Sequence, residues 1–591
     1  MFIQIWLLPF ALLVTAILLA FPLSRYLAWI MDGNYQPLAI FKWFEKRLNF
    51  GPQNWQQYAG SLLIFNTLLF VFGFLILALQ PWMPLNPSGK TMLAPTTIFN
   101  SVIAFMTNTD LQHYAGEQYL SNFSQIFFCI TNLFLSAAIG FSALTAIIRA
   151  LRSDLAVGNF FLDMWRIVVY IFLPIAFMLG IIFISQGTPM TFKSSIQVTS
   201  LETPTLQQTL VVGPVAAFEA IKMLGTNGGG FYAMNSAHPF ENPTAFSNFF
   251  NTLAMLLLPF SLVLMYGRML KRVRHSLIIF SVMLFLMVSA IIWTITFDTL
   301  KPNPALMGHA EQNYKIVTVP ATTNLPVDQH LGNLEGKEMR FGTSAGATFA
   351  ALTTGVACGA INAEMDSLNP LAALTPLLGM WLNCIFGGKG IGMISMLLYI
   401  ILGIFIAGMM VGRTPEYLGK KIGAREVKLV IIALLIHPLM ILAPTGLFAA
   451  THWGINAVTN PGAHGLTQIL YQFSSAAANN GSAFNGLNLT YGFWNNLNPA
   501  PEAIAWDITT GLIMIFTRFL PILAPLAMAA YLGAKKTSPY SLGTLRDDTM
   551  TFWFLLLGTI FIIGALLFLP VATLGPLAEQ LGPIPFTKMS F

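Results

Sequence analysis

The sequence predicts an all-α polytopic membrane protein, with ten transmembrane helices and four pseudo-repeats of span, re-entrant pore loop and span around one central pore. Three observations carry this prediction: the composition, the number of long apolar segments, and the recurrence of one short loop. Of the 591 residues, 55% are hydrophobic and only 9% are charged, whereas soluble domains carry about 25% charged residues. Such a chain belongs in a lipid bilayer.

Ten apolar segments are long enough to cross a membrane, since a span needs about 20 apolar residues. The seventh segment is too long for one straight helix and is broken by glycines at 386–392. We therefore count it as one crossing made of two half-helices. The expected spans are 3–23, 58–80, 124–148, 167–186, 247–267, 276–297, 368–411, 429–450, 506–533 and 551–572.

Basic residues give the orientation of these spans. The N-terminal segment is apolar from Phe2 to Leu23 and its first basic residue is Arg25, which favours a permanent span over a cleaved signal peptide. With the N-terminus outside, 19 of the 29 lysines and arginines lie in cytoplasmic loops, as the positive-inside rule requires. The external segments 187–213 and 298–342 are expected to form a small cap, too small for a catalytic domain.

One short loop recurs four times, with glycine in three copies and Asp110 in the glycine position of the fourth, and in this topology every copy enters the membrane from the outside. Non-helical backbone is tolerated at membrane depth only where protein buries it or it lines a wet cavity. Glycines let carbonyls turn inward, and a ring of carbonyls can replace the water shell of a cation. The copies are 227–231, 480–484, 358–362 and the weaker 107–110, each preceded by a short semi-apolar segment: 214–225, 467–478, 343–354 and 96–106.

Four divergent repeats give one chain fourfold pseudosymmetry. Helices that enter from outside point their C-terminal ends at the membrane centre, and each end carries about half a negative charge, which favours a cation. Carbonyl rings suit a monovalent ion, because only Asp110 could add a carboxylate. The expected units are an extra span with a cytoplasmic loop at 1–57, repeats at 58–166, 167–275, 276–428 and 429–550, and an extra span at 551–591; the third repeat includes the insert 298–342 and the break at 386–392.

The break in the seventh span is a second candidate site. Four glycines fall within the six residues 387–392, and each costs about 1 kcal/mol in a helix interior, which indicates a real interruption. Lys389 within it is expensive in lipid and functional by default. It fits a loop whose ammonium repels ions moving straight to the cytoplasm; the alternative is a hinge whose lysine reaches a polar cavity. Arg413 fits a gating or subunit-contact role and a membrane anchor equally well.

Other charged residues suggest structural pairs. Arg518 lies in the middle of the ninth span and needs an internal partner. Glu219 and Lys222 are expected to pair behind the second loop. His113 and Glu117 have i, i+4 spacing, and with no third ligand evident we expect an external hydrogen-bonded pair in preference to a metal site.

Four motifs resemble one known family over essentially the whole chain. GTNGGGF within 214–243, SSAAANNGSAF at 474–484, TNTDLQ at 107–112 and GRTPEYLGKKI at 412–422 are similar to KdpA, the potassium-importing subunit family of bacterial Kdp ATPases. The resemblance implies a fold of the potassium transporter superfamily with one filter, although Asp110 departs from the glycine pattern. It implies filter positions Asn108, Thr109, Asp110, Thr226, Asn227, Gly228, Cys358, Gly359, Asn479, Asn480 and Gly481, with Gln112 just outside; it also supports a gate at Gly388, Lys389, Gly390 and Arg413.

The chain lacks the motifs of an ATP-hydrolysing protein, GxxxxGK[ST] and DKTGT. The resemblance therefore implies a channel-like, non-hydrolytic subunit that binds no cofactor and takes K+ as its substrate ion. Its expected partners are a P-type ATPase subunit that uses ATP (KdpB-like), accessory single-span subunits (KdpC-like and KdpF-like) and the lipids of the bacterial inner membrane, without nucleic acid. Alternatives are a stand-alone potassium channel or ion-coupled transporter, and a membrane enzyme using His113, Glu117 and His238.

Overall fold

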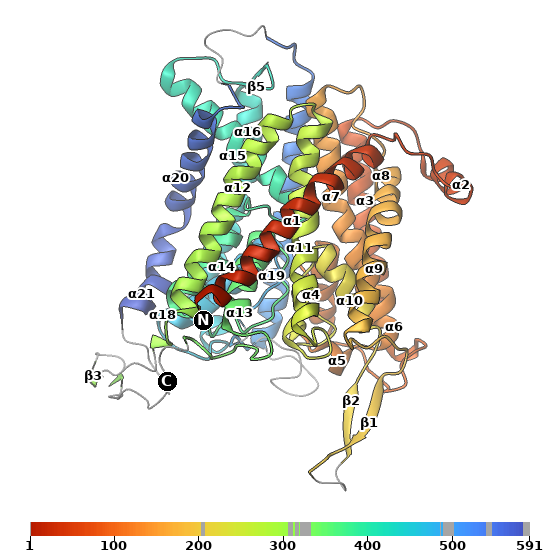
Figure 1. Ribbon diagram of the computed structural model, residues 1–591, viewed down its shortest axis with the longest axis vertical. Helices are drawn as coiled ribbons and strands as arrows, with labels where there is room; N and C mark the ends of the chain where they lie inside the picture. The colour runs from red at the N-terminus through yellow and green to blue at the C-terminus, as the bar shows by residue number, and fades with distance from the viewer. Residues whose placement is uncertain are drawn as a thin grey trace.

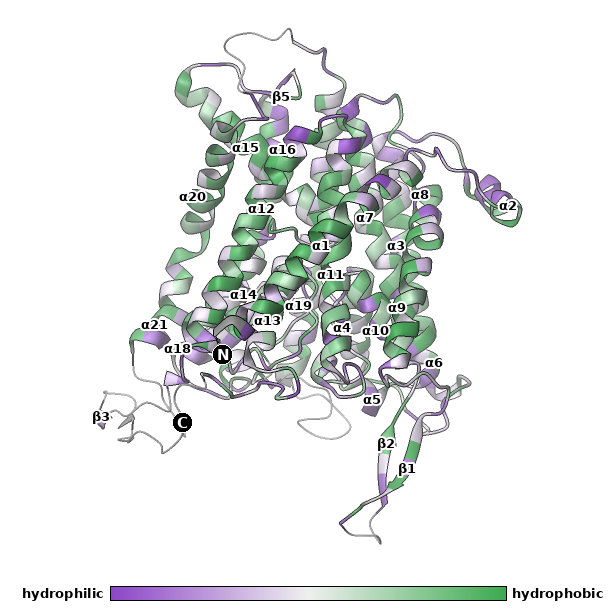
Figure 2. Cartoon of the chain, in the orientation of Figure 1, coloured by the Kyte–Doolittle hydropathy of each residue, from purple (hydrophilic) through white to green (hydrophobic). Residues whose placement is uncertain are grey.

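The computed structural model describes residues 2–202, 207–304, 311–313, 318–319, 332–484, 486–488, 501–538 and 546–582. Long helices run between two opposite faces of the molecule (Figure 1), and their surfaces are largely hydrophobic along their length (Figure 2). The N-terminus lies at the same face as a projecting β-hairpin, opposite the face that carries the amphipathic helix α2 (Ala39–Leu48).

Among the described residues, ten helices are long and apolar enough to cross a membrane, which confirms the predicted fold class. Several continue past the predicted span because the helix extends beyond the apolar run. The spans are α1 (Phe2–Met31), α3 (Trp55–Ala78), α6 (Asn122–Ser124) with η2 (Gln125–Ile130) and α7 (Thr131–Arg152), α8 (Phe160–Arg166) with η3 (Ile167–Phe172) and α9 (Leu173–Ser185), α11 (Ala245–Met269), α12 (Val273–Thr294) with η5 (Ile295–Thr299), α15 (Ile391–Val411), α16 (Ala424–Ala449), α19 (Pro501–Gly533) and α20 (Met550–Leu574).

The four predicted short segments before the loops are helices that do not cross the bundle. They are α4 (Pro95–Met106), α10 (Val215–Leu224), α13 (Thr343–Gly355) and α18 (Ala463–Ala478). The seventh predicted span is interrupted as expected, between α14 (Pro370–Leu382) and α15. Each short helix leads directly into one of the recurring loops.

The remaining elements are short and lie at the two faces. They are η1 (Gln80–Trp82), α5 (Gly116–Tyr119), η4 (Asn235–Ala237), α17 (His452–Ile455), α21 (Pro576–Leu581) and three antiparallel pairs: β1 (Ser195–Thr199) with β2 (Gln207–Val211), β3 (Gln312–Asn313) with β4 (Thr318–Val319), and β5 (Glu416–Tyr417) with β6 (Lys420–Lys421). The β1–β2 hairpin is the only described part of the external segments with long strands, and it projects from the bundle (Figure 1).

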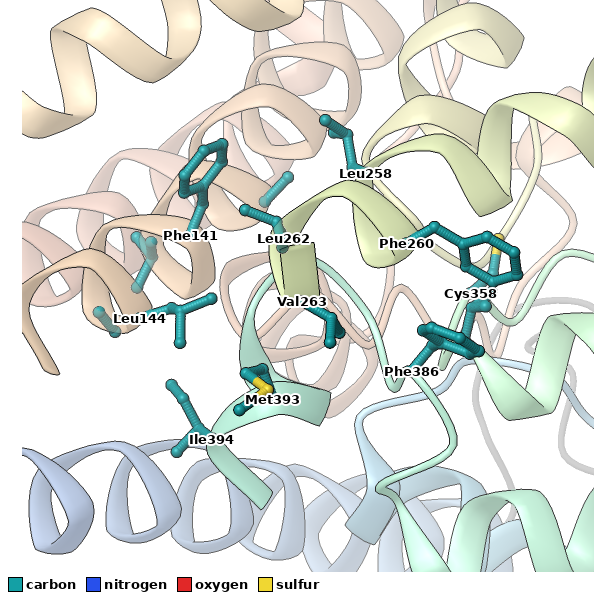
Figure 3. Packing of buried hydrophobic residues seen from close by; sticks show 14 of the residues in the cluster. Phe141, Leu144, Leu258, Phe260, Leu262, Val263, Cys358, Phe386, Met393 and Ile394 are labelled. Carbon is teal, nitrogen blue, oxygen red and sulfur yellow. The ribbon is translucent and has the colours of Figure 1, made fainter. Parts of the chain in front are cut away.

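The apolar core surrounds the loop that breaks the seventh span. Phe260 of α11 packs against Phe386 of this loop, with ring centroids 4.1 Å apart, and Cys358 lies beside the two rings (Figure 3). Met393 and Ile394 of α15 continue the same buried cluster toward α11 and α7 (Figure 3). Core packing therefore fixes the position of the interrupted segment relative to the second and third loops.

Candidate ion filter at the centre of the bundle

The four loops have the same unusual backbone. Left-handed residues recur two or three positions apart in each loop, and between them the chain returns to ordinary conformations. Because an extended strand points successive groups to opposite sides, this alternation is what lets neighbouring peptide groups face the same way. The left-handed residues are Asn108 and Asp110, Thr226 and Gly229, Ala357 and Gly359, and Asn479 and Gly481. Thr226, at φ 43°, is β-branched and strained in this region.

The loops converge on one point. A methyl group at Gly228 would lie 2.7 Å from the Thr109 carbonyl oxygen and 2.9 Å from the Gly481 Cα. A methyl group at Gly359 would clash with the carbonyl of Asn480, and one at Gly481 with the carbonyl of Thr109. Backbone from all four repeats thus meets where only glycine fits, and the C-terminal ends of α4, α10, α13 and α18 all lead to this centre.

Hydrogen bonds join each loop to the next in a closed ring. The bonds run from Asn227 Nδ2 to Asn108 Oδ1 (3.0 Å), from Cys358 Sγ to the Asn227 carbonyl (3.3 Å), from Asn480 Nδ2 to the Thr353 carbonyl (3.3 Å) and from Asn479 Nδ2 to Thr109 Oγ1 (2.9 Å). Three asparagine side chains and Cys358 therefore brace neighbouring loops, in part through the backbone carbonyls of Asn227 and Thr353. All eleven predicted filter residues lie in this assembly.

Gln112 and Asp110 hold the first loop against the second. The Gln112 side chain donates to the Gly230 carbonyl at 3.0 Å and accepts from the Gly230 N–H at 2.9 Å. The buried Asp110 carboxylate accepts from Asn227 Nδ2 at 3.1 Å. Asp110 thus compensates in side-chain contacts for the glycine that the first loop lacks.

Buried charges support the second loop from behind. Lys222 forms ion pairs with Glu219, as predicted, and with Glu241 at 2.6 Å. The sequence did not predict the pairing with Glu241. Its only indication is that Glu241 is an isolated glutamate in the polar segment after the loop. Glu241 also accepts from the backbone N–H of Tyr232 at 2.8 Å, so this cluster fixes the chain as it leaves the filter.

The predicted pair of His113 and Glu117 is wrong. His113 Nδ1 lies 2.7 Å from Asp507 Oδ1, and its Nε2 lies 2.8 Å from Gln472 Nε2. Glu117 instead accepts from the backbone N–H of Ala233 at 2.9 Å. The reason is local: residue 113 precedes the short helix α5, so i, i+4 spacing does not place the two side chains on one helical face.

The residues of the enzyme alternative do not form one site. The ring of His238 stacks on that of Tyr232, with centroids 3.8 Å apart, whereas His113 contacts the fourth repeat. The described residues contain no group of three or more His, Cys, Asp or Glu side chains that could hold a metal ion.

The interrupted segment 383–390 lies directly beneath the filter. The backbone N–H groups of Gly387 and Gly388 donate to the carbonyls of Gly355 and Val356, at 2.9 and 2.5 Å. Lys389, 1% exposed, donates from Nζ to the carbonyl of Thr226 at 2.8 Å. The predicted loop and filter are therefore in direct contact.

Arg413 and Arg518 are placed differently. Arg413 follows α15 at the end away from Lys389, so the predicted gate residues do not form one cluster. It lines a cavity of about 90 Å³ with Pro415 and Glu416. Arg518 donates to the carbonyl of Ser136 at 3.1 Å, which supplies the internal partner that the sequence left open.

A histidine cluster closes the outer end of α18. His464 contacts Asp366 at 3.0 Å and Glu579 at 2.8 Å. Burial alone would lower the pKa of His464, but hydrogen bonds and charge interactions with both carboxylates raise it to about 10. A protonated imidazole thus joins the third and fourth repeats to the C-terminal helix α21.

Comparison with known proteins identifies the family of this chain. The family model described as "Potassium-transporting ATPase A subunit" matches residues 10–581. The chain belongs to this KdpA family. It is 41% identical over 573 residues to a protein of Geobacillus kaustophilus (strain HTA426) named "Potassium-transporting ATPase potassium-binding subunit", covering 96% of this chain and 97% of the relative.

A solved structure confirms the fold at low sequence identity. The potassium transporter TrkH from Vibrio parahaemolyticus matches with a TM-score of 0.50 at 13% identity, covering 81% of this chain and 86% of that chain. The likeness concerns the helical architecture. Together with the family match, it establishes this chain as a multi-pass membrane protein of the KdpA family.

Proposed function

We propose that this KdpA-family chain is the channel-like subunit of an ATP-driven potassium import complex. K+ enters from the outer face, loses its water to the carbonyls of the four loops, and passes to a separate P-type ATPase subunit. The observation that carries the proposal is the closed ring of hydrogen bonds that holds four loops, three of them glycine-containing, at one centre. Backbone carbonyls held in this way are the ligands of a selective monovalent filter.

The direct route to the cytoplasm is closed by segment 383–390, whose backbone is anchored on the third repeat and whose lysine contacts the second. An ion held above this segment must leave sideways, which requires a partner in the membrane. From the family resemblance, the partners we propose are a KdpB-like P-type ATPase and KdpC-like and KdpF-like accessory subunits. The complex lies in the bacterial inner membrane, with the N-terminus of this chain outside.

The test is purification of the complex from its native membrane through a tag on this chain, with mass analysis of the co-purifying proteins. We expect a P-type ATPase among them and an ATPase activity that K+ stimulates and Na+ does not. If the chain purifies alone and passes K+ across vesicles without ATP, the stand-alone channel is the correct function. ATP hydrolysis by the isolated chain would contradict both.

A further inference from the structure

Lys389 reaches the filter as a cation would. It lies on a short non-helical segment. The backbone N–H groups of the two glycines before it, Gly387 and Gly388, are hydrogen-bonded to the C-terminal end of α13. This fixed backbone directs the lysine side chain toward the centre. Nζ lies 2.8 Å from the carbonyl oxygen of Thr226, the innermost predicted filter residue of the second loop. Carbonyls that can replace the water around a metal cation can equally accept from an ammonium group.

With this contact, both lone pairs of the Thr226 carbonyl oxygen accept hydrogen bonds. This oxygen accepts from Asn108 Nδ2 at 3.1 Å and from Lys389 Nζ at 2.8 Å, and a carbonyl oxygen has two lone pairs. While Lys389 is seated, this oxygen has no lone pair left for K+. The buried hydroxyl of Thr226 has no hydrogen-bond partner among the described residues; it faces Gly388, where a methyl group would lie 3.5 Å away.

A positive charge at this point is opposed by burial and by Arg518, and is favoured by Asp110 and by the C-terminal ends of the short helices. Burial disfavours an ammonium unless nearby groups compensate. The C-terminal ends of four short helices lead to the filter, and the Asp110 carboxylate attracts Lys389 while Arg518 repels it. Asp110 is itself bound to Asn227, while the direct contact of the Lys389 ammonium is with the Thr226 carbonyl.

We propose that the Lys389 ammonium is a tethered cation that occupies the innermost carbonyl position of the filter in place of K+. The inference rests on the proposed function, because it takes the converging loops as a K+ filter. The seated ammonium removes the Thr226 carbonyl from the K+ ligands and repels the ion bound above it. It therefore sets how many K+ ions the filter holds and how tightly it holds them.

The decisive variant is Lys389→Met in the assembled complex, because methionine keeps an unbranched side chain and loses the charge. Two charges a few ångströms apart at an effective dielectric of about 20 repel strongly enough for about a tenfold or greater change in affinity. We expect K+ to protect the variant against thermal unfolding at about a tenfold lower concentration than the wild type. Lys389→Arg should retain the wild-type value, as should Lys428→Met, which removes an exposed cytoplasmic lysine.

Thallium, an electron-dense K+ substitute, provides a second measurement on the unmodified complex and does not depend on how the variants fold. Anomalous scattering should place Tl+ in the filter but not on the Thr226 carbonyl. Tl+ on that oxygen in the wild type, or unchanged K+ protection in Lys389→Met, would overturn the tethered cation. If the wild-type complex shows no preference for K+ over Na+, the proposed filter itself fails, which is a different result.

Discussion

Substitution of Gly228 by alanine tests whether the meeting point of the four loops binds potassium. The added methyl group would lie 2.7 Å from the Thr109 carbonyl oxygen and 2.9 Å from the Gly481 Cα, both below the 3.0 Å that real Cβ contacts respect. Both neighbours are backbone atoms, so no side chain can rotate away. The first and fourth loops must therefore move apart by some tenths of an ångström.

The size of the effect follows from this forced movement. Overpacking of a tightly packed site costs about 1–3 kcal/mol, and about 1.4 kcal/mol corresponds to a tenfold change in affinity. Because the displaced atoms belong to the loops that we propose to bind the ion, we expect K+ affinity to fall about ten- to a hundredfold. A distorted ring also fits K+ no better than Na+, so discrimination between the two ions should decrease.

The assay is the concentration of K+ that protects the purified complex against thermal unfolding, with Na+ as competitor. Gly558→Ala is the matched control, since it adds the same methyl group to α20 with no atom within 4 Å. The control should bind K+ as the wild type does. If Gly228→Ala melts like the wild type without ligand and keeps its K+ affinity and selectivity, the loops are not the filter.

Three further changes test the supports of the filter. Lys222→Met leaves two buried carboxylates without their cation and should destabilise the protein by about 3–5 kcal/mol in thermal unfolding, whereas the exposed Lys193→Met should change little; equal effects would contradict the buried cluster. Because the folded pKa of His464 is about 10 against its ordinary 6.5, its stabilisation is complete below the lower value and is lost as pH rises through the higher one. His464→Gln should remove this part of the alkaline pH dependence of stability, and an unchanged profile would disprove the assignment. Gln112→Ala loses the two hydrogen bonds to Gly230 that join the first loop to the second, each of about 0.5–1.5 kcal/mol, and should weaken K+ protection several-fold, whereas Gln118→Ala at the exposed rim should not.

The helices and loops could be predicted from the sequence because their causes are local. Long apolar runs predict spans, and glycines clustered at 227–230 and 387–392 predict breaks. Alternating left-handed conformations at Asn108 and Asn479 also fit residue type, since asparagine tolerates this region. The structure contains the ten spans and the interruption between α14 and α15 that the sequence predicted.

Contacts between repeats could not be predicted in the same way. His113 pairs with Asp507, 394 positions away, and Lys389 binds a carbonyl 163 positions away. No local spacing specifies such partners, because they depend on how the repeats pack around the axis. The one side-chain pair inferred from helical spacing outside a helix, His113 with Glu117, was wrong for that reason.

Pseudosymmetry within a single chain permits a device that exact fourfold symmetry would forbid. In a tetramer of identical subunits, a lysine that reached the axis would appear four times, and four ammonium groups around one carbonyl ring would repel one another by several kcal/mol at effective dielectrics of about 20. Here a single lysine, Lys389 of the third repeat, binds a single carbonyl, that of Thr226 in the second repeat. Under the proposed function, divergence of the four repeats thus allows one positive charge at the inner end of the filter while other loop carbonyls bind the transported ion.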